Sequence, residues 1–84
     1  MKIVTNTSNI YDEVVAIMQR HSQTTVTYSM DTHIASDLAL DSIAMFELLM
    51  DIEEHFDIGL SVEEGAALDT IKALVAAISE KIEQ

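Results

Sequence analysis

The sequence contains neither cysteine nor proline and has no long hydrophobic run. Without cysteine, disulfides, thiolate metal sites and cysteine nucleophiles are excluded. No apolar stretch is long enough to cross a bilayer, and the first residues lack the basic-then-apolar pattern of a signal peptide. We therefore expect a cytoplasmic protein that does not insert into membranes. With 49% hydrophobic residues and neither internal repeat nor linker, the chain is expected to fold as one domain over residues 1–84.

Basic residues are also scarce. The chain has four lysines and arginines against fifteen aspartates and glutamates, for a net charge of −11. Between Arg20 and Lys72 there are eleven acidic residues and no lysine or arginine. Such a stretch repels nucleic-acid phosphates and anionic membranes and attracts basic protein surfaces. We expect no nucleic-acid binding, and the concentration of acids on one predicted helix favours the steering of a partner over solubility alone.

Hydrophobic periodicity predicts four helical segments and one long connection. The first helix is expected to end at His21 and to have Ser8 or Asn9 as its N-cap. The second covers residues 42–56 and is followed by Gly59, whose freedom in the left-handed region suits a helix exit. These two segments are the longest expected elements of an all-α domain.

Two further helices are predicted after that exit. Ser61 and Glu64 have the spacing of a capping box, which predicts a short helix over residues 62–67. Asp69 is expected to cap the last helix. The apolar stripe of that helix comprises Ile71, Leu74, Val75, Ile78 and Ile82.

The connection over residues 22–41 is rich in serine and threonine but also carries apolar residues. A structureless loop of this length is unusual in a compact domain, so we expect its apolar side chains to pack onto the helices. Ile34 and Leu38, at i and i+4, are expected on a single helical turn. Residues 25–30 alternate like a strand, but nothing else in the chain offers them a partner strand.

The helix over residues 42–56 has apolar side chains on two faces. One stripe, assigned to the core, comprises Met45, Leu48, Leu49, Ile52 and Phe56. A second apolar row comprises Ile43, Phe46 and Met50, with Glu47, Glu53 and Glu54 beside it. One core stripe is sufficient for a small domain. An additional apolar row framed by carboxylates therefore predicts a binding surface.

Residues suited to metal binding or catalysis are few. His21, His33 and His55 are dispersed, and no pair has the spacing of a metal or catalytic dyad. Asp51 and His55 share a helix face at i and i+4, which we interpret as a surface ion pair rather than a metal site. Residues 57–64 lack the ligand spacing of an EF-hand loop. We predict no metal site.

The pair Asp41-Ser42 precedes the apolar run of the second helix. Taken alone, such a pair is most simply a helix N-cap. A hydroxyl at a helix N-terminus also lies where unpaired N–H groups and the positive end of the helix favour an attached phosphate. A phosphate-linked group on Ser42 would emerge beside the second apolar row. An enzyme with Ser42 as nucleophile would need a histidine base, and no histidine is placed for it, so we predict no catalytic residue.

At these residues the sequence resembles the acyl carrier proteins. The resemblance rests on Leu38-Ala-Leu-Asp41-Ser42-Ile43, then Glu47-Leu48, then Glu53-Glu54-His55-Phe56-Asp57-Ile58, and length, acidity and helix order extend it over nearly the whole chain. It implies that Ser42, preceded by Asp41, carries phosphopantetheine transferred from coenzyme A. The terminal thiol of the attached phosphopantetheine then holds acyl groups as thioesters. It also implies an up-and-down bundle of three main helices plus one short helix.

The resemblance further implies that partners recognise the helix over residues 42–56. The expected partners are a phosphopantetheinyl transferase and acyl-transfer or synthase enzymes with basic docking surfaces, and we expect the carrier to be a monomer. The residues expected in recognition are Ile43, Phe46, Glu47, Met50, Glu53 and Glu54.

Three positions depart from typical fatty-acid carriers: Ala39 replaces a glycine, Ile43 a leucine and Phe46 a valine. These departures favour a specialised carrier of a lipid, polyketide or amino-acid pathway over the housekeeping carrier. A peptidyl or aminoacyl carrier and an unmodified acidic helical interaction module remain as alternatives. The cargo is predicted to lie between the second helix and the last. Its predicted lining is Met45, Leu49, Leu74, Val75 and Ile78.

Overall fold

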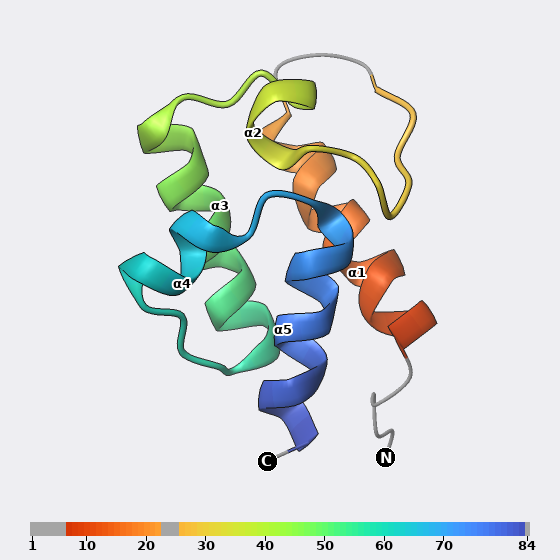
Figure 1. Cartoon of the computed structure of the whole chain (residues 1–84), viewed down its shortest axis with the longest axis vertical. Coiled ribbons are helices and arrows are strands. Elements are labelled where there is room, and N and C mark those ends of the chain that lie inside the picture. The colour runs from red at the N-terminus through yellow and green to blue at the C-terminus, as the bar shows by residue number, and fades with distance from the viewer. Residues whose placement is uncertain (1–6, 23–25, 84) are drawn as a thin grey trace.

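A computed structural model describes residues 7–22 and 26–83, which form five α-helices (Figure 1). They are α1 (Thr7–His21), α2 (Ile34–Asp37), α3 (Ser42–Phe56), α4 (Val62–Ala67) and α5 (Ile71–Glu83). The described ranges contain no strand and only an isolated β-bridge between His33 and Thr70. The all-α prediction is confirmed, with three main helices as expected and two short helices instead of one.

The three main helices enclose the core. α1 packs against both α3 and α5, and α2 and α4 lie across the other side of the bundle (Figure 1). The stripe predicted for α5 is at most 1% exposed except at Ile82, which is half-buried against the core. The inward apolar side chains of α1 are buried to the same degree. The core comprises Ile10, Val14, Ile17, Met18, Ile34, Leu38, Leu40, Leu48, Ile52, Ile71, Leu74, Val75 and Ile78. Each buried leucine or isoleucine contributes about 1.5–3 kcal/mol by leaving water.

The predicted cap of α1 and the predicted left-handed residue after α3 are wrong. α1 begins at Thr7, so neither Ser8 nor Asn9 precedes it as an N-cap. α3 ends as predicted at Phe56, but the left-handed residue that follows is Asp57, with φ 56°, and not Gly59. Aspartate tolerates this conformation better than most residues with a Cβ, so the chain turns directly at the helix end.

The N-terminus of α5 is held by the preceding chain. The Thr70 hydroxyl caps it by accepting from the Ala73 N–H (3.2 Å), so the cap predicted for Asp69 is wrong. The Ile71 and Lys72 N–H groups donate to carbonyls of residues 32 and 30, at 3.0 and 2.9 Å. These bonds satisfy N–H groups that a helix start leaves without an intrahelical partner.

The long connection packs onto the bundle as predicted. Ile34 and Leu38 are buried and lie on and just after the single turn α2. The Ile34 N–H donates to the Asp69 carbonyl (2.9 Å), which ties α2 to the start of α5. Residues 26–29 have no regular structure, and Thr25, the first residue of the strand-like alternation, lies outside the described residues.

Within residues 7–22 and 26–83, none of the helices combines the length and the apolar character that a membrane span requires.

Candidate functional site

At the start of α3, Asp41 caps the helix and Ser42 is left exposed beside it. Asp41 is the N-cap: its Oδ1 accepts from the Ala44 N–H at 2.8 Å, and its carbonyl accepts from the Met45 N–H at 2.9 Å. Ser42 is the first residue of the helix and is exposed. Because Asp41 supplies the cap, the Ser42 hydroxyl is not needed for it. Ser42 therefore presents an accessible hydroxyl at the positive end of a 15-residue helix.

The turn between α2 and α3 places Ser42 at the surface. After α2 the Ala39 N–H donates to the Ser36 carbonyl (3.3 Å) and the Leu40 N–H to the Ala35 carbonyl (2.9 Å). This pair of bonds is a Schellman motif, in which the central residue adopts a left-handed conformation. Ala39 does so with φ 56°, at the position where glycine would be unstrained. Leu38 and Leu40 on either side are buried and anchor the turn.

The two faces of α3 are used as the spacing predicted. Leu48 and Ile52 are fully buried, and Met45, Leu49 and Phe56 are half-buried against the core. On the other face the exposed fractions of the side chains are 71% for Ile43, 56% for Phe46 and 54% for Met50. The exposure of this apolar row is confirmed, and its part in partner recognition stays a prediction.

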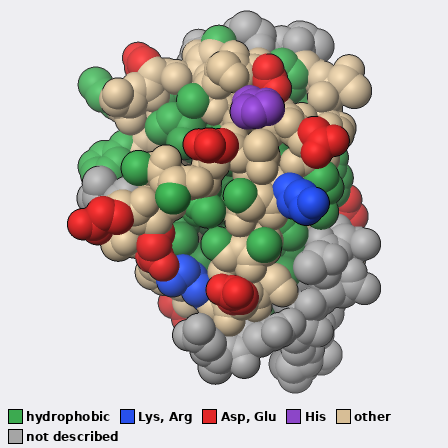
Figure 2. All heavy atoms as spheres, viewed as in Figure 1, with side chains coloured by type: hydrophobic (Ala, Val, Ile, Leu, Met, Phe, Trp, Pro, Cys, Tyr) green, Lys and Arg blue, Asp and Glu red, His purple; other side chains and the backbone are tan. Residues whose placement is uncertain are grey.

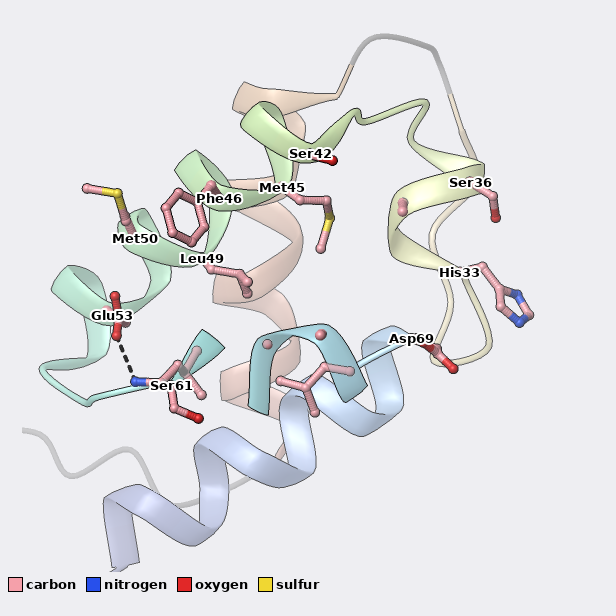
Figure 3. Close-up of a pocket in the computed structure, with 15 residues that line it drawn as sticks. His33, Ser36, Ser42, Met45, Phe46, Leu49, Met50, Glu53, Ser61 and Asp69 are labelled. Atoms are coloured by element: carbon pink, nitrogen blue, oxygen red, sulfur yellow. Dashed lines mark hydrogen bonds between the residues drawn. The ribbon is translucent and has the colours of Figure 1, made fainter. Parts of the chain in front are cut away.

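The three glutamates predicted beside the apolar row are not equivalent. Glu47 and Glu54 are exposed. Glu53 is half-buried, and its Oε2 accepts from the Leu60 N–H at 2.7 Å (Figure 3). On the face drawn in Figure 2, acidic side chains are spread among apolar ones and basic side chains are few. The electrostatic potential around the described surface is thus negative. The Glu53 carboxylate contributes to this potential and also accepts a local hydrogen bond.

A pocket of about 630 Å³ opens beside Ser42 between α2, α3 and α4 (Figure 3). Met45 and Leu49 point from α3 toward α4 and form its apolar wall. The complete lining is His33, Ala35, Ser36, Ser42, Met45, Phe46, Leu49, Met50, Glu53, Leu60, Ser61, Gly65, Ala66, Leu68 and Asp69. The volume lies in the range of sites for small organic ligands.

The pocket coincides with the predicted cargo lining only in part. Met45 and Leu49 do line it, but Leu74, Val75 and Ile78 do not. Those three side chains are at most 1% exposed because the stripe of α5 that carries them is already packed in the core with α1. The space next to Ser42 therefore lies between α3 and α4 and not between α3 and α5.

Gly65 explains how α4 approaches α3 so closely. A Cβ built on this buried glycine would lie 2.6 Å from Leu49 Cδ1, so any side chain would displace Leu49. Sequence reasoning did not select Gly65 for the site. A signal was present, because a glycine inside a predicted helix weakens the helix and calls for a reason such as tight packing.

The short helix α4 is fastened at its N-terminal end. The predicted capping box is confirmed: the Glu64 N–H donates to Ser61 Oγ (3.0 Å), and the Ser61 N–H donates to Glu64 Oε1 (2.9 Å). Glu64 also pairs with Lys81 of α5 at 3.0 Å. The Ser61 N–H, and after it Lys81, lower the pKa of the Glu64 carboxyl. The pocket wall formed by α4 is thereby connected to α5.

The predicted ion pair between Asp51 and His55 is wrong. Asp51 pairs with Arg20 (2.9 Å) and His21 (3.0 Å), and His55 pairs with Glu13 (2.6 Å). All three partners lie on α1, because the face of α3 that carries Asp51 and His55 is turned toward that helix. Hydrogen bonds from His21 and then Arg20 lower the pKa of Asp51. The described residues contain no group of three histidine or carboxylate side chains placed to hold a metal ion.

Comparison with known proteins gives a consistent result. A family model described as "Phosphopantetheine attachment site" matches residues 13–78. An "Acyl carrier protein" of Rickettsia bellii is 28% identical over 80 residues, which cover 94% of this chain and 93% of that protein. A "Probable acyl carrier protein" of Caulobacter vibrioides is 34% identical over 50 residues, or 60% of this chain, and the match spans only 58% of that relative's length.

A solved structure shows the same fold. The "toxoplasma specific mitochondrial acyl carrier protein" superposes with a TM-score of 0.82 over 99% of this chain and 98% of that one. Its sequence identity is 16%, so the likeness concerns the arrangement of the helices.

Proposed function

Because the chain belongs to the acyl carrier protein family, we propose that it holds acyl groups as thioesters on a phosphopantetheine arm attached to Ser42. Members of this family are carriers rather than enzymes, and phosphopantetheine is their cofactor. The observation that supports Ser42 as the attachment point is its exposed position at the start of α3, beside the pocket and outside the cap that Asp41 provides. We propose that residues 1–84 form one carrier domain.

The local chemistry of the α3 start suits a phosphodiester. In the transfer from coenzyme A, Ser42 Oγ would bond to the phosphorus of the pantetheine phosphate while the bond to adenosine 3′,5′-bisphosphate breaks. The hydroxyl proton would pass to a base of the transferase. The anionic phosphodiester would then lie at a helix N-terminus, where the helix dipole favours negative charge. The thiol at the end of the arm supplies the thioester chemistry.

We propose that the acyl chain occupies the pocket between α2, α3 and α4. Ser42 lies at its edge, and the side chains of Met45, Leu49 and Leu68 offer it apolar contacts. Methionine adapts its shape readily and suits a wall that must accept and release a chain. Loading an octanoyl group should therefore shift the NMR methyl signals of these three residues more than those of Val75 and Ile78. Shifts confined to Ile43 would place the cargo outside the pocket and favour a peptidyl or aminoacyl carrier.

For partners we propose a phosphopantetheinyl transferase and acyl-transfer or synthase enzymes with basic docking surfaces. The exposed row of Ile43, Phe46 and Met50 provides apolar contact. Glu47 beside it contributes to long-range attraction, which mainly raises association rates at low salt. Glu47→Lys should therefore slow association with the transferase, and Phe46→Ala should mainly speed dissociation.

We further propose that the carrier is specialised. Ile43 and Phe46, two of the three departures from typical fatty-acid carriers, are among the most exposed apolar side chains of the described residues. A partner must therefore accommodate their shapes directly. A swap to Ile43→Leu and Phe46→Val should improve transfer by enzymes that serve housekeeping fatty-acid carriers, and unchanged transfer would argue against specialisation.

Intact-mass measurement tests the central proposal. The chain is incubated with coenzyme A and a phosphopantetheinyl transferase, alongside Ser42→Ala and the matched control Ser36→Ala. Ser36 is also exposed and lines the same pocket. We expect one phosphopantetheine on the wild type and on Ser36→Ala, and none on Ser42→Ala. Modification of Ser42→Ala would show that the arm is attached at another residue. An unmodified wild type would favour the interaction-module alternative.

A further inference from the structure

Glu53 differs from the other carboxylates of the acidic row because the segment after α3 is attached to it. Its Oε2 accepts from the Leu60 N–H at 2.7 Å, and its backbone carbonyl accepts from the Ile58 N–H at 3.1 Å. Glu53 thus accepts hydrogen bonds from the N–H groups of both Ile58 and Leu60 in the connection between α3 and α4. Figure 3 shows the carboxylate directed at this connection from the lower part of α3.

The connection is open at Gly59, and the Ile58 and Leu60 side chains on either side of it are half-buried against the core. Asp57 turns the chain in a left-handed conformation, and a Cβ built on Gly59 would meet no atom within 4 Å. Leu60 then returns to the pocket, where both it and Glu53 belong to the lining. The hydrogen bond from Leu60 to Glu53 fixes the backbone at this edge of the pocket, in addition to the packing of the Leu60 side chain.

We propose that Glu53 is a positioning residue that closes the α3–α4 edge of the cargo pocket, and that it is not a docking carboxylate like Glu47. This inference rests on the proposed function, since it assigns the pocket to the acyl chain. A hydrogen bond to a carboxylate is stronger than one between neutral groups, so this contact favours the closed position of the segment. Removing the acceptor frees Leu60 to move away and opens the pocket to water.

Two substitutions at this position separate positioning from docking. Glu53→Gln removes the charge but keeps an oxygen that can accept from the Leu60 N–H. Glu53→Leu is similar in size but has no acceptor. The matched control is Glu47→Gln, which removes one charge from an exposed position of the same helix. Hydrogen exchange of the Leu60 amide in the unmodified chain reports opening of the segment, and the Leu48 amide reports unfolding of the whole domain.

We expect the Leu60 amide of Glu53→Leu to exchange about tenfold faster than in the wild type, measured relative to Leu48. Glu53→Gln should stay within about threefold of the wild type, because a neutral hydrogen bond replaces the charged one. Octanoyl loading should raise the melting temperature less in Glu53→Leu than in Glu53→Gln. Association with a phosphopantetheinyl transferase at low salt should slow more in Glu47→Gln than in Glu53→Gln.

Two results would overturn the proposal. One is an unchanged exchange ratio of Leu60 to Leu48 in Glu53→Leu. The other is a loss of association rate in Glu53→Gln equal to that in Glu47→Gln, with Leu60 exchange unaffected, which would make Glu53 a docking residue. Exchange is measured on the unmodified chain, so a failure of Ser42 to accept the arm would refute the proposed function without deciding the role of Glu53.

Discussion

On the side of α3 that faces α1, Leu48 and Ile52 are fully buried, whereas on the side that faces α4, Met45 and Leu49 are half-buried beside a pocket. The α1 side is also crossed by ion pairs of Asp51 and His55. The α4 side instead has two short helices and a turn with a left-handed alanine. One face of the helix thus provides stability, and this allows the other face to keep space for a ligand.

The largest effect is expected from truncation on the α1 side. Leu48→Ala or Ile52→Ala should lower the free energy of unfolding by about 2–5 kcal/mol, because each leaves a cavity in the packed core. Phe46→Ala, on the exposed row of the same helix, should change it by less than about 0.5 kcal/mol. Urea unfolding followed by circular dichroism measures both. Equal losses at Leu48 and Phe46 would mean that the two faces are energetically alike.

A methyl group added on the α4 side should have a smaller effect. In Gly65→Ala the new Cβ would meet Leu49 Cδ1, so stability should fall by about 1–3 kcal/mol and the pocket should shrink. The melting-temperature increase on octanoyl loading should shrink with it. The double variant Leu49→Ala/Gly65→Ala should show a favourable coupling energy in unfolding experiments, since the clashing partner is gone. If the effects of the two substitutions on the free energy of unfolding are strictly additive, α3 and α4 accommodate the new Cβ without strain.

A gain in stability is expected at the turn before Ser42. Ala39→Gly should relieve left-handed strain of about 1–2 kcal/mol. The greater freedom of glycine in the unfolded chain offsets about 0.4–1 kcal/mol of that gain. The control is Ala35→Gly in α2, which should destabilise by about 0.5–1 kcal/mol. If both variants lose stability in thermal unfolding, Ala39 is not strained in solution.

The smallest effect concerns the ion pairs on the α1 side. Asp51→Asn should cost about 0.2–1 kcal/mol near neutral pH, because the Asp51 side chain is partly exposed. The folded-state pKa of Asp51 is lowered, so its contribution is present above the unfolded pKa of about 3.9 and is lost as the pH falls through the folded value. Melting temperatures of wild type and Asp51→Asn should therefore converge below about pH 4. Asp51→Asn is compared with Glu54→Gln, which removes one charge from an exposed position of the same helix.

Sequence reasoning succeeded where structure depends on neighbours in the chain. The bounds of α3 and α4 follow from local apolar spacing and from the capping box of Ser61 and Glu64, and both were predicted correctly. The exposed row of α3 also follows from periodicity alone. The cap of α5 was misassigned because Asp69 and Thr70 are equally suitable by composition, and only the docking of residues 30–34 decides between them.

The features that sequence reasoning missed depend on contacts between distant segments. Gly65 of α4 and Leu49 of α3 line the pocket side by side, and neither residue indicates the other in sequence. Likewise, the i and i+4 spacing of Asp51 and His55 suggested a pair within α3, but α1 supplies the partner of each, Arg20 for Asp51 and Glu13 for His55. The spacing identified the face correctly and could not reveal what lies across from it.

The helix cap and the proposed attachment hydroxyl are on different residues, and this has a thermodynamic consequence. Since the Ala44 N–H is satisfied by Asp41, esterification of Ser42 breaks no bond that the folded state needs. By linkage, a modification that leaves the native contacts intact does not destabilise the fold, and the interaction of the anionic arm with the helix dipole would favour the folded state. The arm could then be added or removed repeatedly while the bundle stays folded, and enzymes that act on either form would meet the same helix surface.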